Sequence, residues 1–332
     1  MLTAILDRMN SKAKTVLPGP PFDPRSGRIY IVILFWMVIC SSIFSFSSFT
    51  IGTRSFPIMF ASLCWAALNG LLARRYRMER AAMFMEALAV PAIIGAMGMV
   101  SIIAIAAASG PFVDGALVQM DAQLHFDWLA LHQFYAERPV LMAVSRQAYD
   151  AFSYQLLLVP MILWLWRRGE MLWPYIAAYS VALILTIVIF PFFPAAGPYN
   201  HFGISRAHLE PWQWNFGPYI EGLRNGHIRD MTRTSSGLIS VPSFHAAAGI
   251  LFMWACGRIP YLRWAFFALN ATMIVSAIVI GSHYLVDIIA GISVAIVAIG
   301  LAPFLVGGRR RNEALASAIS KKDPSISFSV SE

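Results

Sequence analysis

Long apolar segments alternate with short polar segments along most of the 332-residue chain. A helix needs about 20 mainly apolar residues to span a membrane. Eight segments approach this length: 29–51, 55–73, 81–110, 148–166, 173–193, 242–257, 262–282 and 284–306. The segment at 242–257 is the shortest, and the first segment lacks the small-residue cleavage site of a signal peptide. The pattern therefore predicts an all-α polytopic membrane protein.

Composition agrees with a membrane protein. Hydrophobic residues make up 58% of the chain and charged residues 13%, whereas soluble domains contain about 25% charged residues. These values argue against a conventional soluble enzyme, and the apolar excess argues against a disordered chain. The net charge of +8 is compatible with nucleic-acid binding, so the positions of the basic residues must decide its meaning.

The basic residues are distributed unevenly over the two sides of the predicted spans. If successive spans cross in opposite directions, 18 of the 25 lysines and arginines lie on the side of both termini. Cytoplasmic loops carry such an excess, so we expect both termini in the cytoplasm and no nucleic-acid partner. The opposite, outer side carries seven basic residues, all arginine: Arg54, Arg138, Arg146, Arg206, Arg224, Arg229 and Arg233.

Two long segments, 111–147 and 194–241, lie on this outer side. The first has an amphipathic pattern that is typical of an interfacial stretch, and we expect Asp121 and Asp127 on its solvated face. The second is rich in proline, glycine, tryptophan and arginine. Loops of such length are often functional.

The first stretch with candidate chemistry, Val241–His245, lies at the outer end of a span. Pro242 is expected in the first turn of a helix, where its missing N–H is not needed. The hydroxyl of Ser243 and the unpaired N–H groups of that turn would form an anion site, favoured by the helix dipole. His245 follows in the same turn.

The second stretch, Gly281–Asp287, also lies at the outer end of a span. His283 and Asp287 are four residues apart, which predicts one face of a helix. The carboxylate would accept the Nδ1–H of the imidazole and leave Nε2 as a nucleophile or base. The alternative is an ordinary His–Asp pair at a helix start. An ionisable residue within a span is costly and is usually functional.

These two stretches resemble motifs of the type 2 phosphatidic acid phosphatase (PAP2) superfamily. Its second motif is Pro-Ser-Gly-His, here Pro242 to His245, and its third is Ser-Arg-x5-His-x3-Asp, here Ser276, His283 and Asp287. The resemblance implies a six-helix catalytic domain at 76–307. Around it we expect a cytoplasmic N-terminal tail (1–28), two additional transmembrane helices (29–75) and a disordered cytoplasmic tail (308–332).

The chain departs from the superfamily pattern at several positions. Ala277 stands where the third motif has arginine, Phe244 replaces the glycine of the second motif, and no lysine occurs between Lys14 and Lys321. The first motif is replaced by the proline-rich run 190–199. This run, together with a His-Tyr-x-x-Asp third motif, is similar to the inositolphosphotransferase branch, which includes inositol phosphorylceramide synthases.

The resemblance implies a mechanism through phosphohistidine, without a metal or another cofactor. His283 would attack phosphorus, Asp287 would orient His283 and stabilise its positive charge, and His245 would exchange protons with the leaving and entering oxygens. Cations must still balance the phosphate oxygens in the transition state.

Side chains of the outer segments complete the predicted site. With no lysine available, we expect arginines to bind the phosphate, because one guanidinium can hold two of its oxygens. The candidates are Ser243, Arg224 (the first choice), Arg229 and Arg233 for phosphate binding, and Pro198, Tyr199 and Asn200 as substrate-lining residues.

The expected function is therefore transfer of a phosphoryl-containing headgroup of a membrane lipid. The hydrolytic alternative is a lipid phosphate or polyprenyl diphosphate phosphatase. A lipid transporter or flippase would be expected to have internal repeats and discontinuous mid-bilayer helices, and no repeat is evident in the sequence. A non-catalytic scaffold is a further alternative. We expect a bacterial inner-membrane location with the active site on the periplasmic face.

Reporter fusions test the predicted sidedness. Because positive charge is retained in the cytoplasm, green fluorescent protein fused after Glu332 should fluoresce, and alkaline phosphatase at the same position should be inactive. The same reporters inserted in segment 194–241 are the control and should behave in the opposite way. Active phosphatase after Glu332 would reverse the assignment.

Overall fold

The computed structural model describes residues 26–52, 54–204, 211–231 and 238–306. Within these ranges the regular elements are all helical, and an isolated bridge pairs Thr50 with Asp230. The predicted apolar segments form the following helices: α2 (Gly27–Phe46), α3 (Ser55–Arg75), α4 (Glu79–Ala108), α7 (Pro139–Leu165), α8 (Gly169–Ile189), α11 (Phe244–Cys256), α12 (Arg263–Val279) and α13 (Leu285–Leu305).

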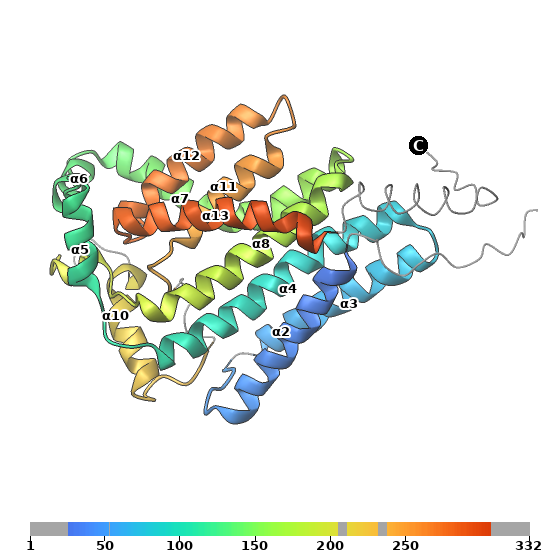
Figure 1. Cartoon of the computed structure of the whole chain (residues 1–332), viewed down its shortest axis with the longest axis horizontal. Helices are drawn as coiled ribbons and strands as arrows, with labels where there is room; N and C mark the ends of the chain where they lie inside the picture. The colour runs from blue at the N-terminus through green and yellow to red at the C-terminus, as the bar shows by residue number, and fades with distance from the viewer. Residues whose placement is uncertain (1–25, 53, 205–210, 232–237, 307–332) are drawn as a thin grey trace, which may run out of the picture.

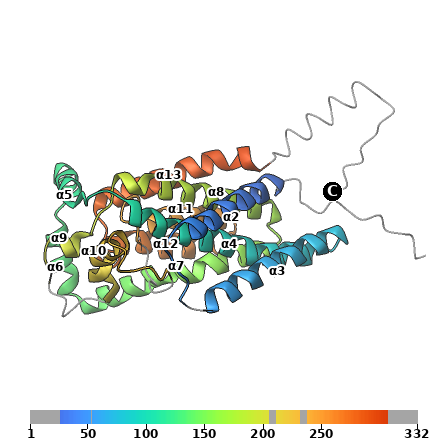
Figure 2. The same ribbon diagram turned by 90° about the horizontal axis from the view of Figure 1, so that it is seen from below.

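Shorter elements connect these helices: α5 (Asp114–Gln123), α6 (Trp128–Ala136), η1 (Phe190–Phe192), α9 (Pro198–His201) and α10 (Pro211–Arg224). Figure 1 shows α5, α6 and α10 at one end of the long helices, and Figure 2 shows α9 at the same end. We call this end, formed by α5, α6, α9 and α10, the site end. These four helices belong to the two long segments that the sequence places together on one side.

Six helices of the described residues are long and apolar enough to cross a membrane, and the chain is a multi-pass integral membrane protein. The two others, α11 and α12, have 13 and 17 residues. The short helix α11 agrees with the short segment at 242–257. The largest difference from the predicted boundaries is in α7, which begins at Pro139 rather than near residue 148. Proline is favoured at such a first helical position.

The core is built around α4, α8, α11 and α13. Helix α13 packs along both α8 and α11, and α4 packs against α3, α7 and α8. Small residues allow the closest approach, as expected for helices that pack within a bilayer. A Cβ atom added to Gly291 of α13 would lie 2.1 Å from the carbonyl oxygen of Ser243. The start of α11 therefore rests directly on the backbone of α13.

The N-terminal helices α2 and α3 pack on α4. Arg74 at the end of α3 donates from Nε to Glu86 Oε1 at 3.2 Å, and its Nη2 pairs with the other carboxylate oxygen. Glu86 is fully buried, so this pairing offsets the cost of a charge within the helix bundle. Trp36 of α2 donates to the hydroxyl of Ser101 at 2.8 Å. Polar contacts thus connect both helices to α4.

Two glycines of α13 test the close contact between α11 and α13. Gly291→Ala places a methyl group against the Ser243 carbonyl and should destabilise the protein by about 1–3 kcal/mol, as overpacking does. Gly300→Ala is the matched control, because nothing lies within 4 Å of its Cβ position. It should be neutral or stabilise by up to about 1 kcal/mol, the difference in helix propensity. Thermal unfolding in detergent measures both, and equal stability of the two variants would contradict the packing.

Candidate active site

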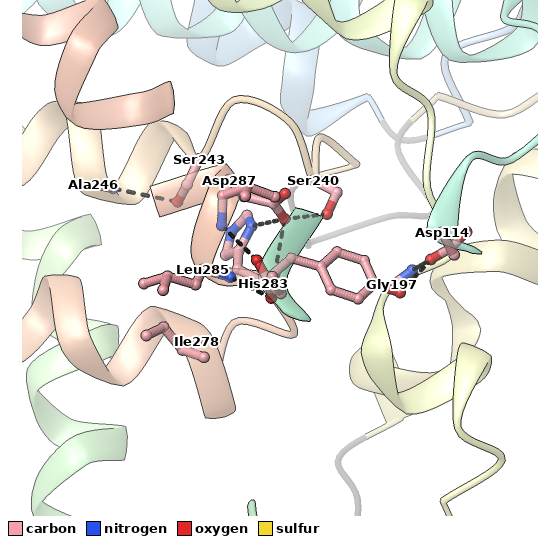
Figure 3. Close-up of polar contacts among 12 residues, drawn as sticks. Asp114, Gly197, Ser240, Ser243, Ala246, Ile278, His283, Leu285 and Asp287 are labelled. Carbon is pink, nitrogen blue, oxygen red and sulfur yellow. Dashed lines mark hydrogen bonds and ion pairs between the residues drawn. The ribbon is translucent and has the colours of Figure 1, made fainter. Parts of the chain in front are cut away.

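His283 and Asp287 meet at the start of α13. Nδ1 of His283 lies 3.3 Å from Oδ2 of Asp287, and both side chains are buried. The expected contact is present, but the expected single helix face is wrong. His283 precedes the N-cap residue Tyr284, and α13 begins only at Leu285. Ser282 adopts a left-handed φ of 57°, so a turn rather than a helix directs the imidazole toward the carboxylate (Figure 3).

Further donors converge on the carboxylate of Asp287. Its Oδ2 accepts hydrogen bonds from the hydroxyl of Ser240 at 2.7 Å and from the backbone N–H of Tyr284 at 3.0 Å. These bonds fix the carboxylate, which accepts a hydrogen bond from Nδ1–H when the imidazole carries its proton on Nδ1. In that tautomer Nε2 of His283 carries the free lone pair. The arrangement is suited to a nucleophilic histidine.

The start of α11 is connected to the same residues. The backbone N–H of Ser243 donates to the carbonyl oxygen of Asp287 at 3.0 Å. Ser243 is the N-cap of α11, and its hydroxyl accepts from the N–H of Ala246 at 3.4 Å. Pro242 therefore lies before the helix and not in its first turn as expected, and its bond to Val241 is cis. The hydroxyl of Ser243 serves as a cap.

The imidazole of His245 is held between aromatic rings of α7. Its ring centroid lies 4.2 Å from that of Tyr149, with nearly parallel planes, and 4.2 Å from that of Phe152. Tyr149 also borders the turn before His283. A Cβ atom at Gly281 would lie 2.8 Å from Tyr149 Cε2 and 3.0 Å from His283 Cδ2. The two histidines therefore share one aromatic neighbour.

Two aspartates of α5 stabilise the site from outside the predicted motifs. Asp121 accepts from the backbone N–H groups of Leu285 and Val286, both at 2.9 Å. It is buried, so the expected solvated position is wrong, whereas Asp127 is exposed as expected and caps α6. Burial raises the pKa of Asp121, and the two N–H groups oppose this shift. The N–H donors favour the ionised carboxylate that they bind.

The other aspartate, Asp114, holds the proline-rich segment. It accepts from the N–H groups of Ala196 and Gly197 and from the hydroxyl of Tyr284, each at 2.8 Å. Gly197 has a φ of 86°, and a Cβ atom there would lie 2.7 Å from the hydroxyl of Ser282. Only glycine meets both requirements without strain. Asp114 thus joins α5, the proline-rich segment and the start of α13.

These aspartates determine which helix start remains available to an anion. The first N–H groups of α13 donate to Asp121, and the N–H of Asp287 donates to the carbonyl of Tyr284. In α11 the cap uses the N–H of Ala246. The preceding N–H groups of Phe244 and His245 have no partner within a helix. The start of α11 is therefore the place where the helix dipole and free donors favour a phosphate.

The predicted lining residues occupy α9. Tyr199 is buried and donates its hydroxyl to the carbonyl of Val279 at 2.9 Å. Burial raises the pKa of Tyr199, and the positive charge of Arg146 opposes that shift. Pro198 is also buried, while Asn200 is half-buried and donates to the carbonyl of Ala196 at 2.8 Å. Tyr199 thus lies against the end of α12, just before the His283 turn.

Trp128 of α6 supports the His283 turn from the other side. Its indole N–H lies 3.2 Å from the carbonyl oxygen of His283 and 3.3 Å from that of Ile278. The indole stacks on Phe202 and on His132. An aromatic group from the predicted interfacial segment 111–147 therefore fixes the turn that carries the candidate nucleophile.

The predicted phosphate-binding arginines are not gathered at the histidines by any contact in the described residues. Arg224 donates to the hydroxyl of Ser109 at 2.9 Å and to the carbonyl of Gly110, at the end of α4. Arg229 is exposed and donates to the carbonyl of Gly226 at 3.2 Å. Arg233 lies outside the described residues.

Comparison with known families agrees with this geometry. A family model described as the PAP2 superfamily matches residues 115–301, a range that includes His245, His283 and Asp287. The chain belongs to the PAP2 superfamily. Together with the apolar helices, this membership indicates a membrane phosphatase or phosphotransferase. Searches of curated proteins and of solved structures found no match. The PAP2 match starts within α5, so α2, α3 and α4 lie before it.

Substitutions of Asp121 in α5 and of Asp127 at the N-cap of α6 test whether the contact between α5 and the start of α13 stabilises the protein. Asp121→Asn keeps the size of the side chain but turns an amide NH₂ toward a backbone N–H, and should cost about 1–3 kcal/mol because a buried donor loses its acceptor. Asp127→Asn is the control, since asparagine is as good an N-cap as aspartate. Thermal unfolding in detergent compares them. If Asp121→Asn were as stable as the control, the α5 contact would have no structural role.

Proposed function

We propose that this PAP2 protein transfers a phosphoryl-containing headgroup from a membrane lipid to His283 and then to an alcohol. The observation that carries the proposal is the contact between Nδ1 of His283 and Oδ2 of Asp287. This contact leaves Nε2 as the nucleophile and stabilises the positive charge that a phosphorylated imidazole acquires. The superfamily membership of residues 115–301 supports the same chemistry.

The reaction proceeds in two steps. In the first, Nε2 of His283 forms a bond to phosphorus as the bond from phosphorus to the leaving oxygen breaks, and His245 donates a proton to that oxygen. In the second, the acceptor oxygen attacks phosphorus, the bond to Nε2 breaks, and His245 takes the proton of the acceptor. The N–H groups at the start of α11 stabilise the phosphate oxygens in both steps.

The acceptor determines the product. Water gives a lipid phosphate or polyprenyl diphosphate phosphatase, whereas a lipid or polyol hydroxyl gives a phosphotransferase. The proline-rich run before Tyr199 and the sequence His283-Tyr284-x-x-Asp287 favour transfer, because both are similar to the inositolphosphotransferase branch. The charge distribution favours an outer location of the site, on the periplasmic face of a bacterial inner membrane.

Activity of the purified protein in detergent tests the proposal. Phosphatidate, polyprenyl diphosphate, and phosphatidylinositol with ceramide are offered separately. Release of inorganic phosphate identifies a phosphatase, and a new phospholipid with release of diacylglycerol identifies a transferase. His283→Ala should abolish either activity because the nucleophile is lost. Asp287→Asn should lower kcat by about 10⁴-fold, as the corresponding change in a Ser-His-Asp triad does.

The exposed residue His227 provides the control, and His227→Ala should retain full activity. Full activity of His283→Ala would refute the mechanism. Turnover of none of the lipids by the parent protein would refute the proposed function itself.

A further inference from the structure

The proposed reaction requires a cation that the recognised motifs do not provide. Phosphoryl transfer places negative charge on oxygens around phosphorus, and cations usually stabilise it. Ala277 stands at the position of the third-motif arginine, and no lysine lies between Lys14 and Lys321. The site also contains the buried carboxylates of Asp114, Asp121 and Asp287. Their negative charges oppose the binding of a phosphate.

Most outer arginines of the described residues are held elsewhere. Arg138 lies over the ring of Phe134 at 3.9 Å and is exposed. Arg224 is held at the end of α4 and also lies over the ring of Phe112 at 4.5 Å. Arg229 is exposed at the Gly226 turn. Arg54 is exposed at the start of α3, a helix that packs on α4.

Arg146 differs from these arginines because it lies on the face of α7 that borders the histidines. It precedes Tyr149 by three residues, which places both on one helix face. Tyr149 stacks on His245 and borders the turn before His283. Helix α7 starts at the site end, so Arg146 lies about one turn nearer to that end than Tyr149. Its position on α7 is therefore about one turn outside the ring that stacks on His245.

The environment of Tyr199 gives a second indication that the charge of Arg146 acts at this site. The positive charge of Arg146 opposes the rise in the pKa of Tyr199 that burial causes. The hydroxyl of Tyr199 donates to the carbonyl of Val279, and the ring packs in one cluster with Ala277 and Ala246. The charge of Arg146 therefore acts on a side chain that lies beside Ala277, the position of the third-motif arginine.

We propose that Arg146 binds the equatorial oxygens of the lipid phosphate at His283 and replaces, from α7, the arginine that is absent at Ala277. The assignment rests on the proposed function, since it names the cation of the same site. Arginine suits this role because its planar guanidinium grips two oxygens at once. Its half-buried position reduces screening of its charge by water.

Orthovanadate binding and lipid turnover test the assignment on the full chain in detergent. Arg146→Ala should lower kcat/KM by about 100-fold or more, comparable to the loss of an oxyanion donor, and should abolish the rise in Tm that orthovanadate causes in the parent protein. Arg146→Lys retains the charge but not the two-point contact, and should recover part of both. Arg138→Ala, on the same segment but held by Phe134, should behave as the parent.

The outcomes separate the two proposals. If the parent is stabilised by orthovanadate and Arg146→Ala is stabilised equally, Arg146 does not bind the phosphate while the proposed function stands. If the parent turns over none of the lipids and orthovanadate has no effect on it, the site does not bind phosphate and both proposals fail. Unfolding of Arg146→Ala before ligand addition is checked by its Tm. If Arg146→Ala is unfolded, Arg146→Lys is the deciding variant. The assignment is overturned if Arg146→Lys has the same kcat/KM as the parent protein and the same rise in Tm with orthovanadate.

Discussion

One carboxylate oxygen, Oδ2 of Asp287, holds the candidate site together. It accepts hydrogen bonds from the hydroxyl of Ser240 and the backbone N–H of Tyr284, and it lies within hydrogen-bond distance of Nδ1 of His283. A buried carboxylate without donors would cost several kcal/mol, and these three contacts offset that cost. Each donor also has a second consequence. Ser240 fixes the segment before α11, Tyr284 starts α13, and His283 acquires the tautomer that a nucleophile needs. Local stability and the proposed reactivity therefore depend on the same atom.

The aspartates of α5 extend this principle to the surrounding chain. Asp121 occupies the first N–H groups of α13, and Asp114 binds the proline-rich segment. Because carboxylates occupy the first N–H groups of α13, the start of α11 rather than that of α13 favours an anion. The same negative charges make a cation necessary beside the phosphate. The carboxylates that hold the backbone of the site thus repel a bound phosphate, and the proposed role of Arg146 is to offset that repulsion.

The helices were predictable because a bilayer imposes a minimum length on each apolar segment. The contact of His283 with Asp287 was predictable from their spacing, although a turn rather than a helix brings them together. The role of Asp121 was not predictable from the sequence, because its hydrogen-bond partners lie 164 and 165 residues further along the chain. Asp114 and Asp121 are seven residues apart and so share one helix face, which is the pattern that could have indicated a common partner.

The arginine that we propose as the phosphate ligand could not be chosen from its distance along the sequence. Arg224 precedes the second motif by fewer than 20 residues, yet α10 packs against α4 and the guanidinium binds the end of that helix. Arg146 precedes the same motif by almost 100 residues, but α7 packs against both α11 and α12. Helix packing, which depends on shape complementarity along whole helices, decides which of these arginines belongs to a helix that packs beside the histidines.

The central claim is that Asp287 makes His283 the nucleophile, and trapping of the phosphorylated intermediate tests it most directly. The protein is mixed with a lipid phosphate labelled at phosphorus, quenched with base within one turnover, and digested for mass spectrometry. The account predicts an acid-labile, base-stable phosphoryl group on the imidazole of His283, which is absent from His283→Ala and strongly reduced in Asp287→Asn. A turning-over protein that shows no phosphohistidine, or one that carries the label on another residue, would contradict it.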